Sequence, residues 1–107
     1  MPGVNFAVLR EQLAMADVLR LLRFVPSRVR GEQLRGACLV HESRELRGPR
    51  SRSFSVNLRL GRYQCFRCGS RGNALELWAA ARGVSLYAAA IELCESLEID
   101  VPWIKRA

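Results

Sequence analysis

The chain has 107 residues, half of them hydrophobic, and its 17 basic and 10 acidic side chains give a net charge of +7. A chain of this length forms one small domain, and a composition so rich in apolar residues excludes a disordered tail. Charged side chains between Arg10 and Arg23 interrupt the apolar start of the sequence, so neither a signal peptide nor a membrane span is expected. We therefore predict one domain, residues 1–107, in the reducing cytoplasm and without a membrane partner.

The N-terminal segment, residues 1–27, carries the periodicity of two short helices. Apolar side chains recur at helical spacing from residue 5 to residue 24, and Asn5 is a suitable N-cap for the first helix. Asp17 is expected to cap the second helix, residues 18–24, which Pro26 ends. We interpret both helices as elements that cover the core.

The middle of the chain has the pattern of a small sheet. Residues 27–35 resemble a strand pair or an extended connection, and residues 42–52 are almost free of apolar side chains, which predicts an exposed basic loop. From residue 53 to residue 60, polar and apolar side chains alternate, as in a half-buried strand. A turn at Gly61 should lead into a partner strand, residues 63–66.

The C-terminal segment, residues 73–107, returns to helical periodicity. Asn73 and Glu76 have the spacing of a capping box, and Gly83 is expected to end the first helix. Ser85 can cap the last helix, whose apolar side chains share one face. Three glutamates are expected on its outer face: Glu92, Glu95 and Glu98.

Two pairs of potential metal ligands stand out in the middle segment, residues 28–72. Cys38 and His41 form a C-x2-H pair, and after a gap of 23 residues Cys65 and Cys68 form a C-x2-C pair followed at once by a glycine. Zinc prefers four nitrogen and sulfur ligands, and a Cys3His set leaves no open position for a substrate. The spacing therefore predicts one structural Zn²⁺ ion, which contributes on the order of 10 kcal/mol to folding. The fourth cysteine, Cys94, is expected to be a buried apolar residue.

The positive charge is concentrated on the segment with the metal ligands. Residues 28–71 contain eleven arginines and three glutamates, a balance of +8, whereas residues 72–104 contain one arginine and five acids, a balance of −4. A polyanion is the natural partner for such a surface, and nucleic acid is the most common one. A solvated basic surface without a partner is the alternative.

These motifs resemble the CHC2-type zinc finger of bacterial DnaG-type primases. The resemblance rests on the two ligand pairs, on Gly69 after the second pair, and on Gly72 and Asn73, which open a helix. It implies an α+β fold with a small zinc-ribbon antiparallel sheet flanked by helices. It also implies a module that engages a single-stranded DNA template and helps to choose where an RNA primer starts, alongside a separate polymerase, helicase or mobile-element protein. The chain departs from the family pattern at residues 39–40, where the family usually has a proline, and in its longer arginine-rich stretch after His41.

A binding platform is expected on the sheet, where bases stack on an aromatic ring and arginines hold phosphates. Tyr63 and Phe66 cannot share one face of a regular strand, so we expect Tyr63 in the core and Phe66 exposed. The expected nucleic-acid-binding residues are Arg59, Arg62, Phe66, Arg67 and Arg71.

Catalysis by this chain alone is not expected. Its acidic residues are scattered along helix faces, so they form no cluster for the two metal ions of a polymerase site, and no small-molecule substrate is indicated. An alternative function is a zinc-stapled protein-interaction adaptor, in which the ribbon and the acidic C-terminal helices dock a partner and the arginines are incidental.

Overall fold

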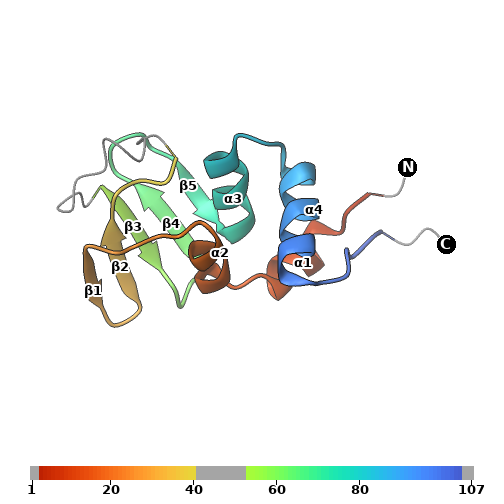
Figure 1. The fold of residues 1–107 in the computed structure, drawn as a ribbon, viewed down its shortest axis with the longest axis horizontal. Coiled ribbons are helices and arrows are strands. Elements are labelled where there is room, and N and C mark those ends of the chain that lie inside the picture. The colour runs from red at the N-terminus through yellow and green to blue at the C-terminus, as the bar shows by residue number, and fades with distance from the viewer. Residues whose placement is uncertain (1–2, 41–52, 105–107) are drawn as a thin grey trace.

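The computed structural model describes residues 3–40 and 53–104, and within them a five-stranded antiparallel sheet is flanked by four helices (Figure 1). The strands follow one another in chain order across the sheet, from β1 at one edge to β5 at the other. The predicted α+β, zinc-ribbon-like fold class is confirmed. The elements are α1 (Phe6–Gln12), α2 (Met15–Leu21), β1 (Arg28–Arg30), β2 (Gln33–Gly36), β3 (Phe54–Asn57), β4 (Arg62–Cys65), β5 (Arg71–Asn73), α3 (Ala74–Arg82) and α4 (Leu86–Leu97).

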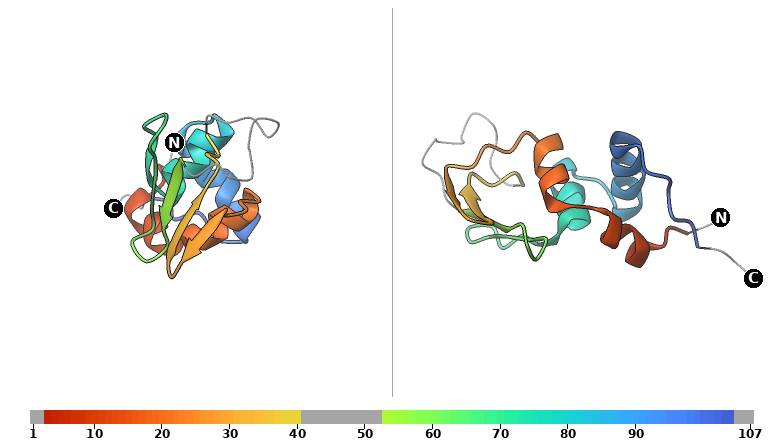
Figure 2. Two further views of the ribbon diagram at one scale, coloured as in Figure 1. Left: turned by 90° about the vertical axis from the view of Figure 1, so that its left-hand side faces the viewer. Right: turned by 90° about the horizontal axis from the view of Figure 1, so that it is seen from below.

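The molecule is elongated, with the sheet at one end, α1 and α4 at the other, and α2 and α3 between them (Figures 1 and 2). Val4 forms an isolated antiparallel bridge with Trp103, so the first and last described segments lie side by side. Within the described residues no single helix is long and apolar enough to cross a membrane; α3 and α4 together meet that length and composition, but they are bent by 104° at the break between them.

The N-terminal helices differ in part from the prediction. Asn5 caps α1 as expected, because its side-chain oxygen accepts the Val8 N–H at 3.2 Å. The predicted start of the second helix was wrong: α2 begins at Met15 after Ala14, and Asp17 lies in its first turn, 3.5 Å from Arg20. A carboxylate in the first turn is favourable with the helix dipole even without a capping hydrogen bond.

The sheet confirms a strand pair within residues 27–35, because β1 pairs with β2. The strand predicted for residues 53–60 is shorter, since β3 ends at Asn57. The side-chain oxygen of Asn57 accepts the Leu60 N–H at 3.0 Å, which closes a local turn in place of further strand pairing. As a result the side chain of Leu60 is 68% exposed rather than buried.

One face of the sheet forms part of the core. Leu34, Val56 and Tyr63 are aligned across β2, β3 and β4, and directly opposed residues of antiparallel strands share a face. In the next row Phe54 is fully buried and stacks on Tyr63, with ring centroids 5.6 Å apart. The same buried cluster includes residues of α2 and α3, which lie beside the sheet, and of α4, which packs on the far side of α3 (Figure 1).

The helices after the sheet begin as predicted. Asn73 and Glu76 form a capping box at the start of α3, and the Ser85 hydroxyl accepts the Ala88 N–H at the start of α4. Of the three glutamates expected on the outer face of α4, Glu95 and Glu98 are exposed, and Glu92 is partly exposed with 30% of its side chain accessible. One of its carboxylate oxygens accepts hydrogen bonds from both Trp78 Nε1 and Arg82 Nε, each at 3.0 Å, and so joins α3 to α4.

Candidate metal centre and nucleic-acid interface

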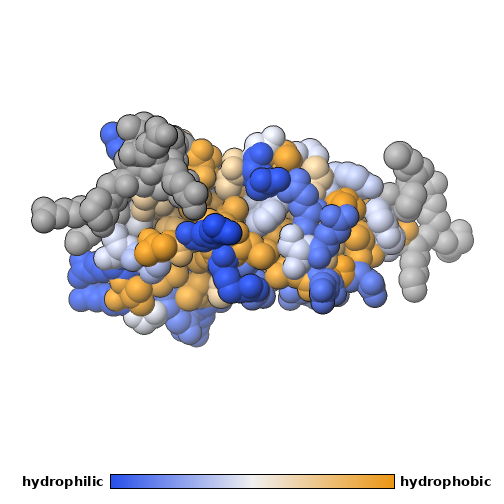
Figure 3. Space-filling view, in the orientation of Figure 1, coloured by the Kyte–Doolittle hydropathy of each residue, from blue (hydrophilic) through white to orange (hydrophobic). Residues whose placement is uncertain are grey.

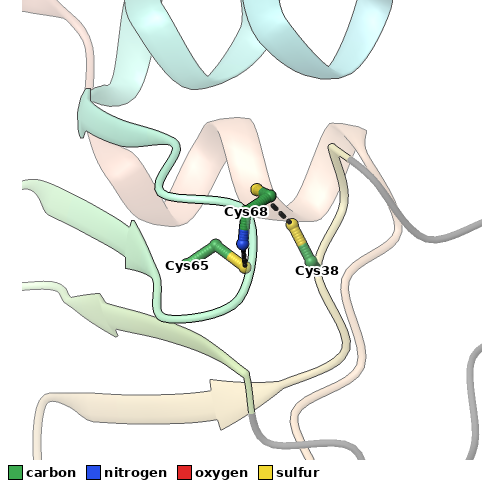
Figure 4. A group of neighbouring side chains, drawn as sticks. All are labelled: Cys38, Cys65 and Cys68. Carbon is green, nitrogen blue, oxygen red and sulfur yellow. Dashed lines mark hydrogen bonds between the residues drawn. The ribbon is translucent and has the colours of Figure 1, made fainter.

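Three cysteines converge beyond the C-terminal ends of β2 and β4, the two strands that flank β3 (Figure 4). Cys38 follows β2, Cys65 is the last residue of β4, and Cys68 lies in the turn after it. Their sulfur atoms all lie within 4.8 Å of one another. Cys38 and Cys65 are buried and Cys68 is exposed, so the cluster lies at the surface of the core.

The turn from Cys65 to Cys68 directs backbone N–H groups at sulfur. The N–H groups of Arg67 and Cys68 both donate to Cys65 Sγ at 3.4 Å. Gly69 has a φ of +80° and donates its N–H to the carbonyl oxygen of Cys65, a geometry that favours glycine. On the other side, the N–H of Val40 donates to Cys38 Sγ at 3.3 Å. Such donors stabilise sulfur in its negatively charged form.

The acidity of the Cys65 thiol reflects this arrangement. Burial raises the pKa of Cys65, but hydrogen bonds from the backbone N–H groups of Cys68 and Arg67, and the neighbouring thiols of Cys68 and Cys38, outweigh burial and bring the pKa below its ordinary value of 9.0. The thiol of Cys94, buried in α4 as predicted, has no such donors among the described residues, and burial raises its pKa. Of these two thiols, that of Cys65 is therefore the one biased toward the thiolate that binds metals.

The donor set fits zinc. A zinc–sulfur distance of about 2.3 Å places tetrahedral sulfur ligands about 3.8 Å apart. The sulfurs of Cys38 and Cys68 are 4.0 Å apart, close to that value and about twice a disulfide bond length of about 2.05 Å. The fourth predicted ligand, His41, lies outside the described residues.

The other face of the sheet is polar and basic, and no helix of the described residues covers it. The left view of Figure 2 looks onto the strands with α3 and α4 behind them. We call this surface the open face. The register of the five strands places these side chains on it: Arg28, Arg30, Gln33, Arg35, Ser55, Asn57, Arg62, Gln64 and Arg71. On the open face, the side chains of the central strand, β3, are polar and neutral, and four of the five arginines lie on β1, β4 and β5.

A hollow of about 610 Å³ lies on the open face. Its polar lining includes Gln33, Ser55 and Gln64, whose side chains make no hydrogen bond with any other described residue. Amide and hydroxyl groups without partners on an exposed sheet are suited to hydrogen bonding with the edges of bases.

The structure brings together only some of the predicted nucleic-acid-binding residues. Arg62 and Arg71 lie on the open face, and Phe66, which follows β4, is 62% exposed. The guanidinium of Arg35 lies 5.1 Å from the centroid of the Phe66 ring, which places Phe66 next to the β2 side of the face. Tyr63 is buried, so the expected division between the two aromatic residues is confirmed.

The remaining two predicted residues lie elsewhere. Arg67 is exposed within the turn between Cys65 and Cys68, and Arg59 lies in the turn between β3 and β4, where it lines a separate pocket. Three arginines of the open face were not among the predicted residues: Arg28, Arg30 and Arg35. The sequence does carry a signal for them, because polar and apolar residues alternate around Val29 and around Leu34, as they do in a strand. Each of these segments is too short for the alternation to be recognised.

The meandering sheet, the glycine turn and the cysteine cluster define a zinc-ribbon type of domain. A family model of the CHC2 zinc finger matches residues 3–107, so the chain belongs to the CHC2 zinc-finger family. Family membership and the three-cysteine cluster together indicate a zinc-binding domain.

A solved structure has the same fold. The crystal structure of the Aquifex aeolicus primase, with its zinc-binding and RNA polymerase domains, matches with a TM-score of 0.72 at 23% identity. The match covers 92% of this chain and 23% of that chain, so this chain spans about a quarter of the length of the Aquifex primase chain. A search of curated proteins finds no match.

Proposed function

We propose that this chain is a non-catalytic zinc module that recognises single-stranded DNA template in primer initiation, in the cytoplasm and together with a separate polymerase, helicase or mobile-element protein. The observation that carries the proposal is the open face, which combines five arginines, amides that have no hydrogen-bond partner among the described residues, and an exposed aromatic ring. Membership of the CHC2 family supports the same conclusion.

The metal has a structural role in this proposal. Cys38, His41, Cys65 and Cys68 hold one Zn²⁺ ion, which joins the end of β2 to the turn after β4. Phe66 lies between two of these ligands in the chain, so the ion fixes the position of its exposed ring. Zinc contributes the free energy that holds the binding surface in shape and takes no part in a reaction.

The open face provides two kinds of contact. Arginines at its outer strands hold phosphates, and each phosphate contact adds to the salt dependence of binding. The Phe66 ring stacks on a base, a contact that contributes about 1–3 kcal/mol. Gln33, Ser55 and Gln64 contact base edges, which makes binding depend on the template sequence.

A fluorescence-anisotropy titration of the zinc-loaded chain tests the proposal. The probes are a labelled single-stranded oligonucleotide and its duplex, each at low and at physiological salt. We expect binding that prefers the single strand and weakens steeply as salt increases. A lack of binding to the single strand at low salt would refute the DNA-recognition function.

One observation favours the alternative, a protein-interaction adaptor. Val25 and Val29 are 81% and 61% exposed, and Val25 lines an apolar groove between α2 and the sheet, together with Phe24 and Leu34. Figure 3 shows hydrophobic surface in this region beside hydrophilic side chains. The adaptor function predicts salt-insensitive association with a protein and no binding to oligonucleotides, so the same titration separates the two functions.

A further inference from the structure

A second basic pocket lies next to the hollow on the open face. It has a volume of about 490 Å³ and is formed by the link between α1 and α2, the turn between β3 and β4, and the start of α3. Its charged lining residues are Arg10, Arg59 and Arg62, with no acidic side chain among the lining residues that the structure describes. Of these arginines, Arg62 also lines the hollow on the open face, so the two sites adjoin.

The arginines of this pocket are not used to hold the fold together. Arg10 donates Nε to the carbonyl oxygen of Phe6, within its own helix. Within residues 3–40 and 53–104, neither Arg59 nor Arg62 makes an ion pair or a side-chain hydrogen bond. Three positive charges that converge without a carboxylate repel one another, and a bound anion relieves that repulsion.

Apart from Asn73, the other side chains that line the pocket are apolar. Leu13, Met15 and Leu75 are buried beneath it, and Leu60 stands at its rim with 68% of its surface exposed. An exposed leucine beside two arginines has no role in the core. A flat apolar ring packed on Leu60 would remove this surface from water while a charged group on the same ligand remained within reach of the arginines.

We propose that this pocket binds a nucleotide, whose base packs on Leu60 and whose phosphate is held by Arg10, Arg59 and Arg62. Arginine suits this role because its planar guanidinium binds phosphate oxygens in pairs. The nucleotide is either a free nucleoside triphosphate or the next residue of a single strand that leaves the open face past Arg62. The strand source alone rests on the proposed DNA-binding function.

The test is a site-resolved NMR titration of the zinc-loaded, ¹⁵N-labelled full chain. The probes are adenosine triphosphate, a thymidine tetranucleotide and a thymidine dodecanucleotide. Shifts of the Leu60, Gly61 and Leu75 amides on addition of adenosine triphosphate identify a free nucleotide as the ligand. Shifts there with the dodecanucleotide only identify the strand as the source. The amides of Ser55 and Gln64 report on the open face in the same spectra, so the DNA-recognition function can fail independently of the pocket.

Matched arginine variants complete the test. We expect Arg10→Gln and Arg59→Gln each to weaken binding at the pocket by about tenfold, as the loss of one charge-assisted contact implies. Arg20→Gln is the control, since Arg20 lies on α2 with its side chain 66% exposed and outside the lining. Pocket amides that no probe shifts would overturn the proposal. An affinity that changes equally in all three variants would also overturn it.

Discussion

The sulfur atoms of Cys38 and Cys68 lie 4.0 Å apart although 30 positions separate the two residues in the chain. Cys38 follows β2 and Cys68 follows β4. These two strands lie on either side of β3, so the contact joins segments that are not neighbours in the sheet. Closing a segment of this length costs conformational entropy, which a bound metal ion offsets. The sheet should therefore depend on zinc more than the helices do.

Removal of the metal tests this dependence. We expect Cys38→Ser, or chelation of zinc from the unmodified chain, to unfold the sheet, because structural zinc sites contribute about 10–16 kcal/mol in small domains. Cys94→Ala is the matched control, since Cys94 is buried in α4 away from the cluster and its loss should leave the zinc content unchanged. Metal analysis and NMR spectra provide the measurement. A sheet that persists in the metal-free chain would contradict the structural role.

The parts of the fold that the sequence predicted are those set by neighbouring residues. The capping box of Asn73 and Glu76, the cap at Ser85 and the turn at Gly69 each depend on side chains within a few positions of one another. The C-x2-C pair and its upstream partner Cys38 were identifiable because metal ligands have characteristic types and spacings.

The parts that the sequence did not predict depend on contacts between distant segments. Leu60 fits the alternation of a strand, but a local hydrogen bond to Asn57 ends β3 first. Glu92 lies on the helical face expected to meet solvent, yet Trp78 on the preceding helix reaches it. Arg28 and Arg35 became neighbours on the open face only through strand pairing, which short segments do not reveal.

The contact of Glu92 with Trp78 and Arg82 predicts a pH-dependent stability. The hydrogen bond from Trp78, and to a lesser extent the one from Arg82, lowers the pKa of Glu92 from its ordinary value of 4.5. A carboxyl group whose pKa is lower in the folded state stabilises the fold at pH values above its ordinary pKa. This contribution is lost as the pH falls through the pKa of the folded state. Glu92→Gln should therefore reduce the free energy of unfolding at neutral pH and have less effect below pH 4.5.

Urea unfolding of both proteins at each pH measures this effect. The loss of zinc at low pH affects the unmodified chain and Glu92→Gln alike. The quantity compared is therefore the difference in free energy of unfolding between the two proteins, once at neutral pH and once at acid pH. Equal differences at the two pH values would show that the charge of Glu92 does not contribute.

The proposed phosphate contacts of Arg62 and Arg71 predict a change in salt dependence. Each contact with a single strand contributes about 0.7 to the slope of log K against log salt concentration. We expect Arg62→Ala and Arg71→Ala each to reduce the slope by about that amount and to weaken binding to all sequences alike. Gln64→Ala on the same face should leave the slope unchanged and alter the preference between bases. Anisotropy titrations at several salt concentrations provide the measurement, and an unchanged slope in both arginine variants would remove these residues from the interface.

The exposed ring of Phe66 separates binding from stability. Because 62% of the side chain is exposed, Phe66→Ala should change the free energy of unfolding little. Loss of a stacked base should weaken binding to single-stranded DNA by about 1–3 kcal/mol. Tyr87→Ala is a suitable control, since this ring is 47% exposed but lies on α4, away from the sheet. If both variants bind equally well, Phe66 is not a stacking platform.

The close approach of β5 to α3 requires a glycine at position 72. Gly72 has a φ of +150°, and a Cβ atom there would lie 2.9 Å from Glu76 Cβ and 2.7 Å from Glu76 Cδ. The first turn of α3 would have to move, which disrupts the capping box and displaces the neighbouring Arg71 on the open face. We expect Gly72→Ala to lower the free energy of unfolding by about 2–3 kcal/mol.

The comparison for this prediction is Gly61→Ala. Gly61 also has a positive φ, +64°, but no atom lies within 4 Å of its added Cβ, so only the backbone conformation carries a cost of about 1–2 kcal/mol. Urea unfolding of the two zinc-loaded variants therefore measures what the contact with Glu76 and the φ of +150° add to the cost of an ordinary left-handed position. If Gly72→Ala costs no more than Gly61→Ala, the chain has room for a side chain at position 72, and the packing of β5 against α3 is looser than the contact with Glu76 implies.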